Sequence, residues 1–226
     1  MDYRFENGAI IAEGKLYEKA VYDVSNAVFS AAFNGNGGIT KYFIANGTKY
    51  ELNFFLCISY NGVMQDVLLY KKVSMLGRRQ IIWIDLKTAV LEIELFLDKK
   101  ENGIFGSYRL HTDRTDDKIE ISLTDQRRFE GDYQKSRNVF QDDEKAFAAS
   151  GACEYCIENS AITISLTSHE PQVNTFLVYG IIPEHAEEYV RRFDDYRNAL
   201  EKEIQEIRVP DNLTEKEKAL FYSTYY

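Results

Sequence analysis

The sequence predicts a mainly β protein, a large two-layer antiparallel β-sandwich followed by a C-terminal α-helical linker. Tyrosine and phenylalanine are frequent, at 16 and 14 of 226 residues, and proline is rare, at 3. Such a composition favours broad sheets, because aromatic residues fit strands well. Short segments that alternate apolar and polar residues fill the first 180 positions, without the alternating helices of a parallel α/β fold.

The composition also argues against nucleic acids and membranes as binding partners. The formal net charge of −9 is unlike that of a protein that binds nucleic acid or an anionic membrane. The N-terminus has no basic stretch followed by an apolar run, and no window approaches the roughly 18 apolar residues of a membrane span. Three cysteines are too few for a disulfide framework, which favours a reducing cytoplasm. We therefore expect a cytoplasmic protein without a cofactor.

Turn signals divide the N-terminal part into hairpins. Residues 5–17 form a predicted hairpin around Asn7 and Gly8, and residues 34–38 (Asn-Gly-Asn-Gly-Gly) separate two predicted strands. Glycine and asparagine tolerate the positive φ angles that tight hairpins need. Residues 34–38 are not a phosphate-binding loop, because no lysine and hydroxyl pair follows the last glycine and a strand comes next. A second such turn is predicted at residues 46–47.

The remaining strands follow from alternation. In residues 90–98, Leu91, Ile93 and Leu95 alternate with Glu92 and Glu94, as in a sheet with one buried and one wet face. Residues 125–148 break this pattern with many charges, and we interpret them as a long surface loop with one short helical turn. The strands predicted besides residues 90–98 are 27–33, 39–44, 51–60, 66–74, 80–87, 105–111, 118–124, 151–157, 161–167 and 175–181.

The C-terminal segment is predicted to be helical. Pro183 suits the first position of a helix over residues 183–207, where its missing N–H is not needed. At 1.5 Å per residue this helix would be roughly 35 Å long, enough to run along the sandwich. Thr214 and Glu217 have the spacing of a capping box that starts another helix. We expect Tyr189, Val190, Phe193 and Leu200 to lie on the sandwich. The whole apolar stripe of this helix is Ala186, Tyr189, Val190, Phe193, Leu200, Ile204 and Ile207. The predicted units are a β-sandwich at 1–182 and a helical segment at 183–226.

Cysteine and histidine positions give no marked active site. A zinc site needs four ligands, whereas Cys153 and Cys156 form a lone C-x-x-C pair whose thiols would point to opposite faces of a strand. We expect free cysteines and no metal. His111 and His169, with a glutamate, could catalyse sugar epimerisation by general acid–base chemistry, but their spacing does not require it. His185 completes the three histidines, and we expect ordinary surface or half-buried roles for all of them. No catalytic residue is predicted.

Trp83 is the candidate binding residue. It is the one tryptophan of the sequence and shares a strand face with Asp85 and Lys87, opposite Ile82 and Ile84. An indole ring on a wet sheet face offers a flat apolar surface with a polar N–H, which suits stacking against a sugar ring. The alternative is that a helix or a further domain covers the ring.

The order of elements resembles a known family. A large sandwich, a strand with the sequence Phe-Leu-Val-Tyr-Gly at residues 176–180, an amphipathic helix and residues 213–222 resemble the N-terminal part of bacterial six-hairpin glycosidases. These are the glucoamylase, glycogen-debranching and disaccharide-phosphorylase enzymes. The glycine-rich turn at 34–38, followed by a strand and the turn at 46–47, is similar to the opening of their supersandwich domains, which have a galactose-mutarotase-like fold.

The resemblance implies that the chain serves a carbohydrate-processing enzyme, a glycoside hydrolase or phosphorylase. The catalytic acids of that family lie in an (α/α)6 domain after the linker, so none can be assigned here. We expect this chain to support or shape the active site of such a C-terminal helical domain and to be inactive alone. Alternatives are a free-standing carbohydrate-binding module and a mutarotase-like epimerase.

The last predicted helix shows an apolar pattern without an expected partner in the sandwich. We expect these side chains either to fray or to form a homodimer contact through residues 220–226. The side chains concerned are Leu220, Phe221, Tyr222, Tyr225 and Tyr226.

Overall fold

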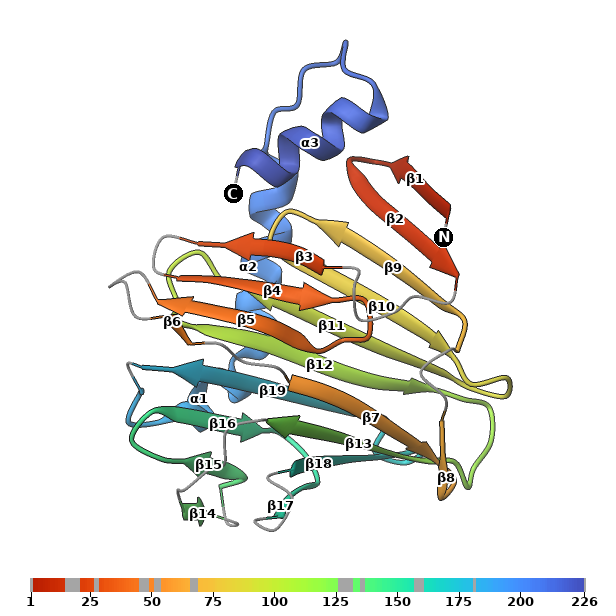
Figure 1. Ribbon diagram of the computed structural model, residues 1–226, viewed down its shortest axis with the longest axis vertical. Helices are drawn as coiled ribbons and strands as arrows, with labels where there is room; N and C mark the ends of the chain where they lie inside the picture. The colour runs from red at the N-terminus through yellow and green to blue at the C-terminus, as the bar shows by residue number, and fades with distance from the viewer. Residues whose placement is uncertain are drawn as a thin grey trace.

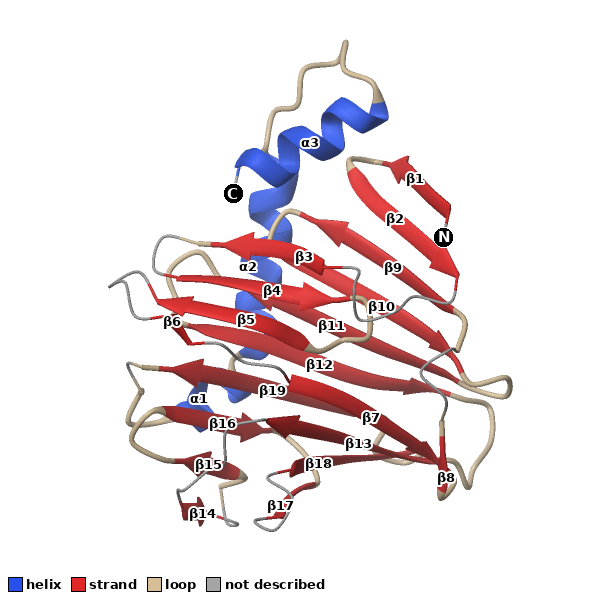
Figure 2. Ribbon diagram, in the orientation of Figure 1, coloured by secondary structure: helices blue, strands red, loops and turns tan. Residues whose placement is uncertain are grey.

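Two antiparallel sheets face each other, and helices lie behind one of them (Figures 1 and 2). This arrangement, in a computed structural model, confirms the predicted mainly β two-layer sandwich with a helical C-terminal segment. The structure describes residues 2–14, 21–26, 29–44, 49–50, 54–65, 69–125, 132–134, 137–156, 161–180 and 182–225.

In the described residues the first sheet, called sheet A, has ten strands, with β1 and β14 at its two ends. On β1, Arg4 pairs with Glu13 of the neighbouring strand at 2.8 Å. All the pairings of the sheet are antiparallel. In spatial order its strands are β1 (Asp2–Glu6), β2 (Ala9–Gly14), β9 (Lys71–Leu76), β10 (Arg79–Asp85), β11 (Val90–Leu97), β12 (Gly103–His111), β19 (Gln172–Tyr179), β16 (Lys145–Ala149), β15 (Val139–Gln141) and β14 (Asp132–Gln134).

The second sheet, called sheet B, faces sheet A across the main core. Two short strands, β6 (Lys49–Tyr50) and β8 (Val63–Met64), pair with β5 and β7 off its main path. The main path is β17 (Cys153–Cys156), β18 (Ala161–Thr167), β13 (Lys118–Asp125), β7 (Phe54–Tyr60), β5 (Ile39–Ile44), β4 (Phe29–Asn34) and β3 (Val21–Ser25). Consecutive strands often belong to different sheets, so the chain passes repeatedly from one layer to the other.

The core between the sheets follows the predicted alternation. Ile82 and Ile84 of β10 are fully buried, as are Ile119 and Ile121 of β13 on the opposite sheet. Intervening positions on the same strands point outward, so the period of two observed in the sequence sets which face each residue occupies.

The turn at residues 34–38 lies against this core. Asn34 Oδ1 accepts the N–H groups of Asn36 and Gly38, both at 2.9 Å. Gly37 has φ +83° and would place a Cβ 3.0 Å from the Ile93 side chain, so a larger residue would be strained by its backbone and crowded by Ile93. The predictions of a hairpin turn here and at Asn7 are confirmed, whereas residues 46–47 lie outside the described residues.

The predicted loop over residues 125–148 is wrong, because its described part forms β14, β15 and β16. All five residues of β16 are buried. Phe147 faces the core between the sheets, while Ala146 and Ala148 face the helices on the other side. A strand buried on both faces does not alternate, so the sequence pattern did not reveal it. The strand predicted at 66–74 is also shifted, since β9 begins at Lys71.

The single helix predicted for residues 183–207 is two helices, α1 (Ala186–Arg191) and α2 (Phe193–Glu206), separated at Arg192. Pro183 precedes the first helix instead of opening it. The stripe still packs as expected on the outer face of sheet A, where Phe193 lies 5.3 Å from Phe96 and Tyr189 stacks on Phe176 at 4.3 Å, measured between ring centroids.

Helix α3 (Glu215–Tyr225) begins with the predicted capping box. The Glu217 N–H donates to Thr214 Oγ1 at 3.3 Å, and the Thr214 N–H donates to Glu217 Oε2 at 2.8 Å. The helix packs beside β1 and β2 (Figure 1), and the Gly8 N–H donates to Glu215 Oε2 at 3.4 Å.

Tyr222 therefore has a partner, contrary to expectation. Its ring covers Gly8, where an added Cβ would lie 2.2 Å from a ring carbon. Ala219 on the same helix is buried, whereas Leu220 is 51% exposed. Tyr226 lies outside the described residues. Within the described part of the chain, no helix has the length and apolarity to cross a membrane.

Candidate functional site

One row of side chains crosses the outer face of sheet A. The strand register places Lys72 of β9 opposite Trp83 of β10, Trp83 opposite Glu92 of β11, Glu92 opposite Arg109 of β12, and Arg109 opposite Gln172 of β19. Directly opposed residues of adjacent strands point to the same face. We call these five residues the Trp83 row.

Trp83 lies where the sequence placed it, on the face opposite Ile82 and Ile84. Its indole Nε1–H donates to Glu92 Oε2 at 3.0 Å. The Lys72 ammonium lies 5.3 Å from the ring centroid, within the range of a cation–π interaction. The ring is half-buried. The contacts with Lys72 and Glu92 that orient it come from the two neighbouring strands.

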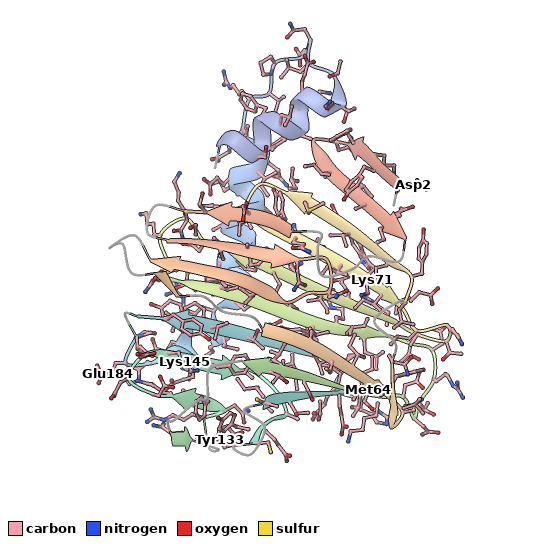
Figure 3. All side chains as sticks on the ribbon, in the orientation of Figure 1. Asp2, Met64, Lys71, Tyr133, Lys145 and Glu184 are labelled. Carbon is pink, nitrogen blue, oxygen red and sulfur yellow. The ribbon has the colours of Figure 1, made fainter. Side chains whose placement is uncertain are left out.

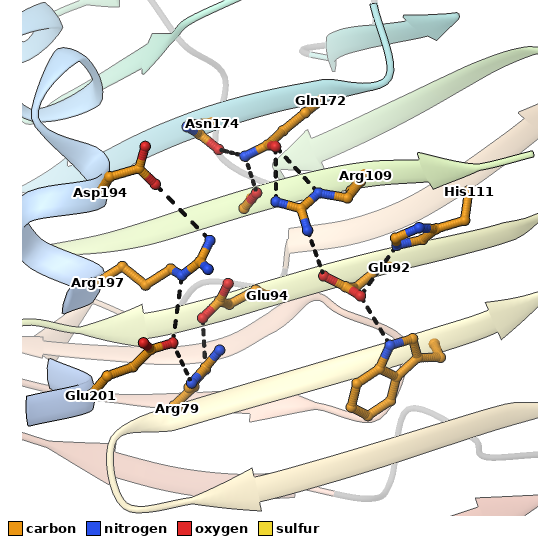
Figure 4. Close-up of polar contacts among 12 residues, drawn as sticks. Arg79, Glu92, Glu94, Arg109, His111, Gln172, Asn174, Asp194, Arg197 and Glu201 are labelled. Atoms are coloured by element: carbon orange, nitrogen blue, oxygen red, sulfur yellow. Dashed lines mark hydrogen bonds and ion pairs between the residues drawn. The ribbon is translucent and has the colours of Figure 1, made fainter. Parts of the chain in front are cut away.

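The Glu92 carboxylate, at the middle of the row, contacts Trp83, His111 and Arg109 (Figure 4). Besides the indole, its Oε2 lies 3.2 Å from His111 Nε2, and its Oε1 lies 3.8 Å from Arg109 Nη1. Three side chains from two other strands thus surround one carboxylate. The structure brings His111, a sequence candidate, beside Trp83 through this shared partner.

The far end of the row is held by amide groups. Arg109 donates to Gln172 Oε1 through Nη2 at 2.8 Å and Nε at 3.2 Å. The Gln172 amide in turn donates to Asn174 Oδ1 at 2.9 Å and to Ser107 Oγ at 3.3 Å. Each member of the row is therefore oriented before any ligand arrives, which lowers the entropy that binding would cost.

Exposure separates the row from the helix-covered part of the same face. Glu92, Arg109 and His111 retain 22%, 33% and 46% of their side-chain exposure, while Phe96 and Phe105, further along the same strands, are fully buried beneath α2. The outer face of sheet A thus has an apolar part under the helices and a polar part open to a ligand.

A line of ion pairs forms the border between these two parts. Arg79 of β10 lies 2.6 Å from Glu94 of β11 and 3.3 Å from Glu201 of α2, and Arg197 of α2 lies 3.6 Å from Glu201 (Figure 4). Burial raises the pKa of Glu94, and the positive charge of Arg79 opposes this effect. The border ties α2 to the sheet immediately beside the Trp83 row.

The other histidines and the cysteines that the sequence analysis considered lie away from the Trp83 row. His169 is exposed in the connection after β18, and His185 lies 3.6 Å from Glu187 at the start of α1. Cys153 is buried and Cys156 exposed, which confirms that the two thiols point to opposite faces. Burial raises the pKa of the Cys153 thiol to about 12. Among the described residues, no group of three His, Cys, Asp or Glu side chains could hold a metal ion.

Sequence reasoning found Trp83 but missed its partners. Glu92, Arg109 and Gln172 come from strands up to 89 positions away. Alternation placed Glu92 on the wet face of its strand. Which residue stands opposite which depends on strand order and register, for which no local sequence signal exists.

The comparisons with known proteins find similarity at the level of structure and not of sequence. No protein-family model matches the chain, and no curated protein sequence matches it. The fold is similar to that of a bacterial glucoamylase solved in complex with acarbose, with a TM-score of 0.48 and 10% sequence identity. The match covers 86% of this chain and 40% of that one, so this chain spans about two fifths of the glucoamylase length.

Proposed function

We propose that this chain is a non-catalytic N-terminal domain of a carbohydrate-processing enzyme, and that Trp83 contacts the carbohydrate. The observation that supports the proposal is the Trp83 row, where one half-exposed indole ring is flanked by oriented carboxylate, guanidinium and amide groups. Sugars combine apolar C–H faces with hydroxyl groups, and such a surface offers partners to both.

The proposed division of the chain has a sandwich at residues 1–182 and a helical segment at residues 183–226 that leads to a further helical domain. Support comes from the element order, since a sandwich is followed by α1, α2 and a capped α3. In this proposal the chain alone turns over no glucosides, because the catalytic acids lie in the further domain. Hydrolysis or phosphorolysis of a glucoside by residues 1–226 would contradict it.

Sugar titrations followed by tryptophan fluorescence test the binding part directly, because Trp83 is the only tryptophan. A panel of neutral sugars and maltooligosaccharides should include a ligand that changes the emission, with the affinity confirmed by calorimetry. Trp83→Ala should weaken binding at least tenfold, which corresponds to about 1.4 kcal/mol, and Trp83→Phe should retain part of it.

Tyr3→Ala is the matched control, since Tyr3 is an aromatic residue 54% exposed on β1, outside the Trp83 row. Its affinity should equal that of the unmodified chain. A sugar contact at Trp83 would be rejected if no sugar of the panel changed the tryptophan emission. It would also be rejected if the Tyr3 and Trp83 variants lost the same amount of affinity.

A mutarotase-like epimerase is the second candidate, favoured by the 3.2 Å contact between His111 Nε2 and Glu92 Oε2. A histidine and a carboxylate beside an aromatic ring can act as a general acid and base. His111→Gln should then abolish the acceleration of glucose anomer interconversion over its spontaneous rate, followed by polarimetry, whereas His169→Gln should not. Unchanged interconversion rates in the His111 variant eliminate this candidate.

A further inference from the structure

The Trp83 row is longer than one sugar. It crosses five adjacent strands, from Lys72 to Gln172, and with strands about 4.8 Å apart the row spans about 19 Å. A single pyranose ring stacked on Trp83 would reach Glu92 but not Gln172. Contact with the whole row requires a ligand that extends over several rings and lies across the strands.

The one carboxylate of the row already has partners within the protein. Glu92 is surrounded by Trp83, His111 and Arg109, and the Lys72 ammonium lies 5.3 Å from the centroid of the Trp83 ring. A carboxylate on a ligand would approach Glu92 and be repelled, whereas a neutral hydroxyl group can donate to it. This balance favours a neutral ligand over an acidic one.

Hydrogen-bonding capacity remains along the row. A guanidinium has five N–H donors, and Gln172 takes two of those of Arg109. Glu92 Oε1 has its nearest cation at 3.8 Å, too far for a direct hydrogen bond. These groups can accept and donate to successive hydroxyl groups without first breaking the contacts that orient them.

We propose, on the basis of the carbohydrate function proposed above, that the row is a binding track for an extended neutral oligosaccharide. One ring stacks on Trp83, and the chain continues over Glu92 and Arg109 to Gln172. The border of ion pairs between Arg79, Glu94 and α2 runs along one side of the track (Figure 4) and sets the direction of the oligosaccharide across the strands.

A chain-length series tests the track. Two series of neutral probes, maltooligosaccharides and cellooligosaccharides of one to seven units, are titrated into the whole chain by calorimetry. In one of the series the affinity should rise at least tenfold from one unit to four or five and then level off. Gln172→Ala should remove this gain for the longer probes and weaken the shortest one much less, because Gln172 lies at the end far from Trp83.

A second row variant and two controls distinguish a loss of the binding track from a loss of the fold. Arg109→Lys preserves the charge but loses the two-pronged contact with Gln172, so it should also flatten the dependence on chain length. Far-ultraviolet circular dichroism and the melting temperature of each variant verify the fold. Tyr3→Ala should match the unmodified chain at every length.

The outcomes separate this proposal from the one on which it rests. Equal affinity for one and for five units, with Trp83 still required, would overturn the track and leave the sugar contact standing. Tighter binding of oligogalacturonate, an acidic probe, than of both neutral series would also overturn it. No binding of any probe would overturn both proposals.

Discussion

Asp117 shows how one buried side chain can join several connections of the sandwich. Its carboxylate accepts hydrogen bonds from Thr112 in its own loop and from Asn61 Nδ2 at 3.0 Å in the β7–β8 turn. Its backbone carbonyl accepts the Ser168 N–H at 3.1 Å in the β18–β19 connection. Burial by itself would raise the pKa of Asp117, but hydrogen bonds from Thr112, Asn61 and Tyr60 outweigh it and lower the pKa below the usual aspartate range.

Replacing this carboxylate should destabilise the fold in a pH-dependent way. A depressed pKa means that the stabilisation is complete above the unfolded-state pKa and is lost as pH falls through the folded-state value. Asp117→Asn should lower the free energy of unfolding by about 1.5–3 kcal/mol at neutral pH, and the difference should shrink in acid. Urea titrations between pH 3 and 7 measure this, with the neighbouring exposed Asp116→Asn as the control. A constant difference across that range would exclude a role for the charge.

At the scale of elements, the contact of α2 with sheet A rests on aromatic rings. Phe193 is 1% exposed, with its ring centroid 5.3 Å from that of Phe96 and 6.2 Å from that of Phe105. Removing a buried phenylalanine side chain costs both apolar burial and a cavity.

Phe193→Ala should therefore lower the free energy of unfolding by about 3–5 kcal/mol, measured by urea unfolding. Asn198→Ala, at an exposed position of the same helix, should change it by less than about 0.5 kcal/mol. A small effect at Phe193 would mean that α2 is held mainly by two ion pairs, of Glu203 with Arg78 and of Glu201 with Arg79.

Helix α3 offers a second test, because two glycines form a matched pair. Gly8 and Gly62 both have φ +77°, but an added Cβ would meet the Tyr222 ring at 2.2 Å in the first case and no atom within 4 Å in the second. Alanine at either site should cost about 1–2 kcal/mol for the left-handed backbone. Only Gly8→Ala should also speed hydrogen exchange of the α3 amides. Equal α3 exchange in the two variants would show that Tyr222 does not hold the helix.

The elements also show what sequence patterns can and cannot reveal. Alternation located β13 and β18 because each has one wet face, and it located β11 because acidic residues occupy part of its outer face. The capping box located the start of α3. Alternation failed to reveal β16, where Phe147 packs into the sandwich and Ala146 packs under α1. The break at Arg192 was missed because the apolar stripe continues through it. Local patterns thus report the exposure of a segment and its ends, but not how many layers cover it.

At the scale of the whole molecule, the path of the chain makes the two layers interdependent. Sheet A is built from β1–β2, β9–β12, β14–β16 and β19, and sheet B from the segments between them. Neither layer can form from one continuous stretch. The same topology explains why the Trp83 row could not be predicted, since Gln172 joins Arg109 only after β13 to β18 have been placed.

The two layers should consequently unfold together. Trp83 reports on sheet A through its fluorescence, and Cys153, which is 8% exposed in β17, reports on sheet B through the reactivity of its thiol. A variant with Cys57→Ser and Cys156→Ser removes the two exposed thiols. In urea the two probes should give coincident midpoints, as two-state unfolding requires. Separate midpoints would show that one sheet survives the loss of the other.

The strand at one end of sheet A has a consequence for how the protein behaves at high concentration. Among the described strands β1 pairs with β2 and stands at the end of sheet A, and the outer edge of such a strand can recruit a strand from another molecule. Asp2 (labelled in Figure 3), Arg4 and Glu6 are exposed along β1. Arg4 is paired with both Glu6 and Glu13. A second copy arriving at this edge would have to strip water from these charges. These three closely spaced charged side chains therefore disfavour the growth of fibrils by strand addition at the β1 edge.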